Sequence, residues 1–149
     1  MIRNILIAAA VLLMSTQIQA KTCELTIDST DQMSFSAKEL KVGTDCTEVK
    51  LTLTHSGKMA KNVMGHNWVL TKTADYQPVA QDGMKAGLDN DYVQADDARV
   101  ITHTKVIGAG ETDSVTFSLE GLEAGGDYTF FCSVPGHWAV MHGKFIIGD

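Results

Sequence analysis

The chain has 149 residues, of which 44% are hydrophobic, with 12 basic and 18 acidic side chains and a formal net charge of −6. This length fits one domain of ordinary size. The acidic balance and the lack of a Lys/Arg run argue against binding to nucleic acid or to an anionic membrane, and we expect much of the Asp and Glu to serve solubility.

The first twenty residues have the features of a cleavable signal peptide. Arg3 is basic, Ile5–Met14 is an apolar run, and Ile18-Gln19-Ala20 offers a cleavage site that ends in a small residue. A membrane-spanning helix needs roughly twenty apolar residues, so an anchor is the weaker interpretation. We therefore expect export and removal of residues 1–20. Loss of Arg3 leaves 11 basic residues against 18 acidic ones, a net charge of −7 for residues 21–149.

Three cysteines remain in the exported segment: Cys23, Cys46 and Cys132. An oxidising compartment permits one disulfide and leaves one thiol over, and three pairings are open. If Cys132 serves as a thiolate ligand, Cys23–Cys46 is the bridge that remains.

Period-two alternation of hydrophobic residues predicts β-strands through most of the exported segment. The clearest is Glu48–Thr54, where Val49, Leu51 and Leu53 share one face. Turn signals rich in glycine separate the strands, and seven or more short strands of this kind predict an all-β sandwich or barrel. The other predicted strands are Thr22–Ile27, His66–Leu70, Val100–Lys105, Ser114–Leu119, Asp127–Cys132 and Lys144–Ile147.

The segment Thr73–Asp97 does not alternate, and part of it is expected to form a short helical flap outside the sandwich. Pro78 limits where that helix can start. Because no repeat or linker interrupts the pattern, we expect one domain over residues 21–149.

A metal site is indicated by Cys132, His137 and Met141, which lie at positions n, n+5 and n+9 with the turn Pro135-Gly136 between the first two. Thiolate and imidazole bind copper strongly, whereas a thioether is a weak ligand that tolerates a long bond. One Cys, two His and a distant Met form the ligand set of a blue-copper electron-transfer centre.

The second histidine of such a set is predicted to be His66. It is expected on the same strand face as Trp68, from which it can point into a closed site. A satisfied core histidine is the ordinary alternative for such a position. The choice of a ligand depends on Cys132 and His137, which need a partner from a rigid strand.

The motifs together resemble the azurins, bacterial members of the cupredoxin family, over essentially the whole exported segment. Val63-Met64-Gly65-His66-Asn67-Trp68 and Cys-x-x-Pro-Gly-His-x-Ala-x-Met at 132–141 carry most of the resemblance. Further matches are Asp31-Gln32-Met33, the pair Cys23 and Cys46, and Asp113-Ser114-Val115-Thr116-Phe117.

The resemblance implies a Greek-key β-sandwich that holds one type 1 copper ion at one end. Cys132, His66 and His137 would form the trigonal ligand plane. Met141 would be a weak axial ligand on one side, and the carbonyl of Gly65 would approach from the other. Backbone N–H groups near Asn67 and Val134 would donate hydrogen bonds to the sulfur of Cys132.

The resemblance also implies a docking surface for redox partners. His137 would reach the surface through an apolar ring, and methionine-rich surfaces adapt to more than one partner. The matched ring positions are Met33, Met59, Val63, Met64, Met84, Pro135, Gly136 and Val140. The family implies a periplasmic monomer whose partners are a c-type cytochrome and a terminal reductase or peroxidase.

Two positions modify this picture. Azurins commonly carry Phe where this chain has Val134, and loss of an aromatic ring beside the thiolate is expected to alter packing or water access and so the reduction potential. His55 corresponds to a partly buried histidine near the site in azurins. Its protonation could couple to the copper charge, or it could be purely structural.

The predicted function is therefore that of a periplasmic type 1 copper protein that shuttles single electrons, without enzymatic activity. A copper enzyme would need further domains or a second metal site with more histidines. A copper store, chaperone or copper-dependent defence protein is the other alternative. A zinc module would normally recruit a Cys, His or carboxylate where this chain has Met141.

Overall fold

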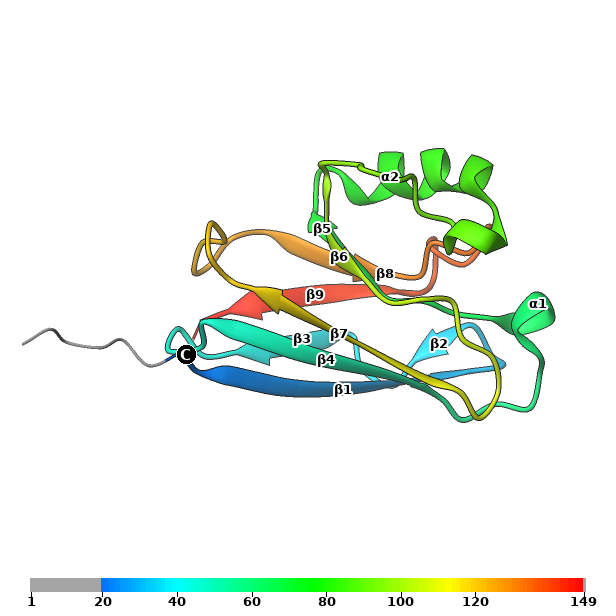
Figure 1. The fold of residues 1–149 in the computed structure, drawn as a ribbon, viewed down its shortest axis with the longest axis horizontal. Helices are drawn as coiled ribbons and strands as arrows, with labels where there is room; N and C mark the ends of the chain where they lie inside the picture. Colours follow the sequence, from blue (N-terminus) through cyan, green and yellow to red (C-terminus); the bar gives the residue numbers. More distant parts are fainter. Residues whose placement is uncertain (1–19, 149) are drawn as a thin grey trace, which may run out of the picture.

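The computed structural model describes residues 20–148, so the predicted signal peptide lies outside the described residues except for Ala20. Within them, two β-sheets pack into a sandwich (Figure 1), which confirms the predicted fold class. The four-stranded sheet has the order β2-β1-β4-β7 and the five-stranded sheet the order β3-β9-β8-β5-β6. The strands are β1 Thr22–Thr30, β2 Ser34–Phe35, β3 Glu39–Val42, β4 Glu48–His55, β5 Val69–Lys72, β6 Val100–His103, β7 Thr112–Ser118, β8 Tyr128–Phe131 and β9 His142–Ile147.

The sandwich core is filled by the inward residues of both sheets. On β4, Val49, Leu51 and Leu53 are fully buried, as their alternation predicts. Trp68 lies at the centre, with its ring 5.9 Å from that of Phe130. Because the pairs β1·β4 and β3·β9 are parallel and the other pairs antiparallel, crossing connections tie the two sheets together.

The segment after β5 forms the predicted helical flap. Helix α2, Tyr76–Gly83, lies outside the sandwich over the five-stranded sheet (Figure 1). Pro78 is its third residue, where a first-turn position needs no intrahelical N–H bond. Val79 and Ala80 are buried against Val69 and Phe131 in a second apolar cluster. The 3₁₀ turns η1, Met84–Ala86, and η2, Leu88–Asn90, follow.

Several predicted strand limits are wrong. The strand predicted to begin at His66 begins at Val69, because His66 makes only an isolated bridge with Ile107 before the chain joins the sheet. The short strands β2 and β3 were not predicted, nor was the single helical turn α1, Lys61–Met64. No helix in the described part of the chain is long and apolar enough to cross a membrane.

The loops gather at the two ends of the sandwich. The β1–β2 turn, α1, η1 and the segment between β8 and β9 lie at one end (Figure 1). The beginnings of β1 and β4 lie at the opposite end, where the disulfide joins Cys23, the second residue of β1, to Cys46, two residues before β4.

Candidate metal centre

Three predicted ligand side chains meet at the loop end of the sandwich. Within the described residues, His66, Cys132 and His137 form the one group of three or more His, Cys, Asp or Glu whose ligand atoms all lie within 4.8 Å of one another. The sulfur of Cys132 is 3.7 Å from Nδ1 of His66 and 3.6 Å from Nδ1 of His137, and the two Nδ1 atoms are 3.2 Å apart. All three side chains are buried, and His137 retains 7% exposure.

His66 is oriented by hydrogen bonds on both its backbone and its ring. Its N–H and carbonyl pair with Ile107 in the isolated bridge, at 3.0 and 2.8 Å. Its Nε2 lies 2.8 Å from the carbonyl oxygen of Thr30, to which it donates. With the proton on Nε2, the lone pair of Nδ1 faces Cys132 and His137. Burial lowers the pKa of His66 to about 4, so the ring is neutral at pH 7.

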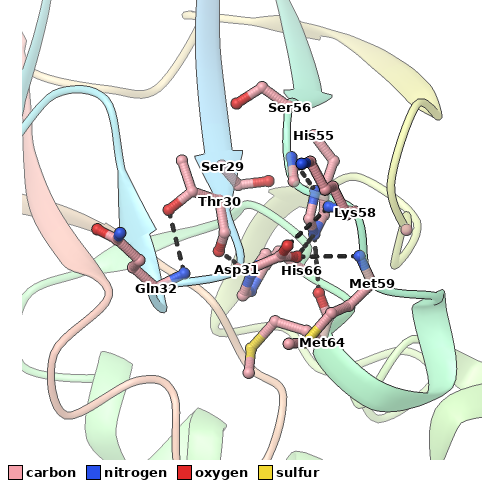
Figure 2. A network of polar contacts seen from close by, with 12 residues as sticks. Ser29, Thr30, Asp31, Gln32, His55, Ser56, Lys58, Met59, Met64 and His66 are labelled. Carbon is pink, nitrogen blue, oxygen red and sulfur yellow. Dashed lines mark hydrogen bonds and ion pairs between the residues drawn. The ribbon is translucent and has the colours of Figure 1, made fainter.

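Thr30, the last residue of β1, supplies the carbonyl that orients His66, and Asp31 holds the turn that follows in place (Figure 2). The carboxylate of Asp31 accepts the N–H groups of Lys58 at 2.6 Å and Met59 at 3.2 Å, on the loop that leads into α1. These hydrogen bonds favour the ionised carboxylate and so lower the pKa of Asp31. The largest contribution comes from the N–H of Lys58. The sequence marked Asp31 only as part of a matched motif; its role emerges from the contacts.

Cys132 follows β8, and its backbone N–H donates to the carbonyl of Met141 at 3.0 Å. Burial raises the pKa of the Cys132 thiol to about 12, although backbone N–H groups of Asn67 and Val134 bond to the sulfur and oppose the rise. The described contacts therefore contain the two N–H donors that the resemblance implied.

The segment from Ser133 to Met141 folds back to bring its other donors to the same place. Gly136 has φ +84°, a conformation that favours glycine, in the turn after Pro135. The N–H of His137 donates to Val134 at 2.9 Å, and the N–H of Met141 donates to His137 at 2.8 Å. Met141 is fully buried in the main core cluster. Val134 is partly buried and packs against the same cluster.

A polar network ties this segment to Asn67, the residue after His66. The Asn67 side chain accepts the N–H of Ser133 at 2.8 Å and donates to the Ser133 hydroxyl at 2.8 Å. Asn67 and Ser133 both donate to the carbonyl of Asp91, at 2.8 and 3.2 Å. Ser133 and Asp91 belong to the site although nothing in the sequence pattern singled them out, because their role depends on long-range contacts.

The donor set fits a copper ion. A first-row ion with bonds of about 2.0–2.3 Å to nitrogen and sulfur needs donors roughly 3.3–3.8 Å apart, close to the separations among these three atoms. A thiolate and two imidazoles with a neighbouring thioether are soft to borderline donors, which copper prefers to calcium or magnesium. Gly65, whose carbonyl is the further weak ligand that the resemblance predicts, directly precedes His66.

His55 lies behind the site. Its ring stacks on that of His66 with centroids 5.0 Å apart. Nδ1 of His55 accepts the N–H of Gly57 at 3.0 Å, and Nε2 lies 2.8 Å from the carbonyl of Met64, to which it donates. Both ring nitrogens thus have partners in the neutral form, which supports a structural role for His55; coupling to the copper charge stays a hypothesis.

Exposed apolar side chains lie on the loops at the metal end of the sandwich. Five large hydrophobic residues within positions 20–148 are more than a third exposed, and all five belong to the predicted apolar ring: Met33 39%, Met59 43%, Val63 64%, Met84 46% and Val140 51%. Pro135 and Gly136 are also exposed, and Met64 is half-buried. The loops that carry them lie at the same end of the sandwich as the metal site (Figure 1).

Comparisons with known proteins agree with this geometry. The family model of copper binding proteins, plastocyanin/azurin family, matches residues 21–148. An azurin of Pseudomonas fluorescens biotype C is 59% identical over 121 residues, which cover 81% of this chain and 94% of that protein. Azurin-1 of Alcaligenes xylosoxydans xylosoxydans is 60% identical over 127 residues, covering 85% and 98% of the two chains.

A solved structure is similar over nearly the same span. The azurin Az-iso2 from the obligate methylotroph Methylomonas sp. strain J superposes with a TM-score of 0.82 at 43% identity. The match covers 85% of this chain and 98% of that one.

Proposed function

Because this chain belongs to the plastocyanin/azurin family of copper-binding proteins, we propose that its copper is held by His66, Cys132 and His137, with Met141 and the Gly65 carbonyl as weak ligands. The protein is a blue-copper electron carrier, in which bound copper supplies the one-electron Cu(II)/Cu(I) couple. The observation that supports this ligand assignment best is the convergence of one sulfur and two Nδ1 atoms within 4.8 Å.

The protein's own contribution is to keep these donors still. The Thr30 carbonyl fixes the His66 ring, and the paired backbones of Cys132 and Met141 fix the two ends of the ligand segment. Because the donors are held by the surrounding fold, both oxidation states meet nearly the same arrangement, and little reorganisation accompanies each electron transfer. Burial keeps water away from the sulfur, while His137 is the ligand nearest to solvent.

The exposed apolar ring around His137 is the proposed docking surface for redox partners. It comprises Met33, Met59, Val63, Met64, Met84, Pro135, Gly136 and Val140. Contiguous exposed apolar side chains mark interaction sites, and methionine side chains adapt to several partners. A c-type cytochrome and a terminal reductase or peroxidase are the proposed partners.

We also propose how the chain is processed and where it acts. Residues 1–20 are a signal peptide that directs the chain to the periplasm, where the domain of residues 21–149 acts as a monomer. Electron transfer is its activity and it carries no catalytic site of its own. The disulfide Cys23–Cys46 fits an oxidising compartment. Cys132 stays outside this disulfide as a buried free cysteine.

The test is to add Cu(II) to the purified apo-protein and record visible and electron-spin resonance spectra. An intense blue band with narrow copper hyperfine splitting is expected. The Cys132→Ser variant should lose the band yet stay folded, whereas a double variant with Cys23→Ser and Cys46→Ser should keep it. A band that survives Cys132→Ser would overturn the assignment.

Electrochemistry separates the carrier from a copper store or chaperone. A carrier gives a fast, reversible one-electron wave and retains its metal. Slow cycling with ready copper release would favour the store instead, and steady turnover of nitrite or oxygen by the protein alone would identify an enzyme.

A further inference from the structure

Exposed lysines accompany the apolar ring at the metal end. Lys58 precedes Met59, Lys61 lies two residues before Val63, and Lys85 follows Met84; all three lysines are exposed. A fourth, Lys38, is exposed on the loop between β2 and β3, and its ammonium group donates to the carbonyl of Val140 at 2.8 Å. Four of the five most exposed apolar side chains therefore have a lysine within two residues or in direct contact. We call Lys38, Lys58, Lys61 and Lys85 the lysine rim.

The rim lysines are not neutralised by ion pairs. Among residues 20–148, the Lys and Arg side chains that form ion pairs are Lys21, Lys50, Arg99 and Lys144, none of which belongs to the rim. The ammonium groups of the rim are thus available to a partner.

The carboxylates near the site are directed at the protein's own backbone. Asp31 accepts two N–H groups of the loop before α1, Asp91 accepts the N–H of Val106 at 2.7 Å, and Glu111 accepts the N–H of Gly108 at 2.6 Å. They are held against the surface, while the lysine side chains can extend from it. Asp82, three residues before Lys85, is paired with Arg99, which leaves Asp89 on η2 and Glu39 beside Lys38 as the exposed carboxylates next to rim lysines in sequence. Positive groups therefore dominate what a protein docked on the apolar ring would meet.

This local charge opposes the charge of the molecule as a whole. The chain carries 18 acidic against 12 basic residues, and its net charge is −6. From the negative net charge alone, a positively charged partner would be expected. At a contact surface the nearby charges decide, because salt screens charges more than about 8–10 Å away.

We propose that the lysine rim recognises a redox protein whose exposed cofactor edge is surrounded by Asp and Glu side chains. The apolar ring would exclude water at the centre of the contact, and the rim would steer the acidic partner and fix its orientation. This inference rests on the proposed electron-carrier function and on the docking surface around His137.

A small anionic oxidant tests the sign of the local charge. Hexacyanoferrate(III) takes one electron from the reduced copper protein, giving the Cu(II) protein and hexacyanoferrate(II). If the rim governs the encounter, the second-order rate constant falls as ionic strength rises, by about tenfold between low salt and 0.3 M salt. A rate constant that rises with ionic strength would mean that the net negative charge governs, which overturns the proposal.

Charge-matched variants locate the effect. The double variant Lys58→Gln/Lys85→Gln should lose most of the attraction. The control Lys41→Gln/Lys72→Gln removes the same charge from exposed positions on β3 and β5 and should keep the wild-type dependence on salt. Equal rates for the two double variants would contradict the proposal.

A protein partner gives the direct test. Electron transfer to a cytochrome c with carboxylates around its haem edge should be faster at low salt than transfer to one with lysines there, and Lys58→Gln/Lys85→Gln should remove the difference. The opposite preference would overturn the proposal. If the blue band and reversible wave persist in every variant, a negative result concerns the rim alone; their absence in the wild type would refute the proposed function.

Discussion

At the scale of single residues, the metal centre consists of groups that are costly to charge without a metal. Burial raises the pKa of Cys132 to about 12 and lowers that of His66 to about 4, and it also lowers that of His137. At pH 7 the apo site therefore holds a neutral thiol and two neutral imidazoles. Copper binds the thiolate form of Cys132, so copper binding removes a proton from that one group only.

Copper binding at neutral pH should consequently release about one proton per ion, from Cys132. From pH 7 up to the pKa of Cys132, the copper affinity should rise about tenfold per pH unit, because both imidazoles are already neutral and only the thiol must lose a proton. Below pH 4 the slope should steepen, as His66 must also be deprotonated to bind.

The measurement is calorimetry of copper binding in buffers that differ in ionisation enthalpy. The Cys132→Ser variant is the control, since its hydroxyl should release no proton. Release of no proton by the wild type would show that the thiolate already exists in the apo-protein.

At the scale of the elements, the connection between β1 and β2 contributes both to the metal site and to the proposed docking surface. Thr30, the last residue of β1, orients His66 through its carbonyl, and Met33 in the turn, with φ 51°, is 39% exposed (Figure 2 shows the neighbouring contacts). Asp31 ties the turn to the loop before α1. One short connection therefore supports a proposed ligand and part of the proposed docking surface.

The disulfide is the covalent link at the opposite end of the sandwich. Cys23 and Cys46 are 23 residues apart in sequence, with Cα atoms 5.8 Å apart. In the chain-entropy model, closing a loop of this length stabilises the fold by about 3 kcal/mol. The double variant with Cys23→Ser and Cys46→Ser should lose about that free energy of unfolding.

Urea unfolding of the copper-free protein measures this loss relative to the wild type with its disulfide intact. The reduced wild type, which also lacks the bond, is the matched comparison for the double variant. The blue band of the copper-loaded variant should stay unchanged, because the disulfide lies away from the metal end (Figure 1). A bleached band would show that the two ends are coupled.

The sequence predicted the elements that follow a local period, and it failed where long-range contacts decide. Alternation in β4 was clear because one face is fully buried. His66 was placed at the start of a strand, but the chain makes one bridge there and turns its next side chain, Asn67, to Ser133. The two residues of β2 are too few to show a period.

The same contrast applies to the candidate site. Cys132, His137 and Met141 are close in sequence, and their spacing alone pointed to copper. Thr30 and Asp91 act through backbone carbonyls, which any residue type could supply, so sequence composition gives no signal for them. His66 was chosen from its predicted strand face beside Trp68, whereas Asp31 was marked only through the resemblance to a family.

At the scale of the whole molecule, the metal site occupies one end of a sandwich whose core is filled mainly by apolar side chains that are not ligands. The central side chains, such as Trp68 and Leu51, are fully buried among apolar neighbours from both sheets. A core of this kind can hold the fold without metal, unlike a small domain whose only core is its metal site.

Copper removal should therefore lower the stability of the protein without unfolding it. Binding to the native state adds RT ln(1 + [L]/Kd), which is about 4 kcal/mol when free copper exceeds its dissociation constant roughly 1,000-fold. Thermal unfolding followed by circular dichroism, with the fluorescence of buried Trp68 as a core probe, should show a higher midpoint for the copper form than for the apo form. Cys132→Ser should unfold at a midpoint that copper changes little. An apo-protein that is already unfolded at 25 °C would show that the metal, and not the packing of the two sheets around Trp68, holds this fold together.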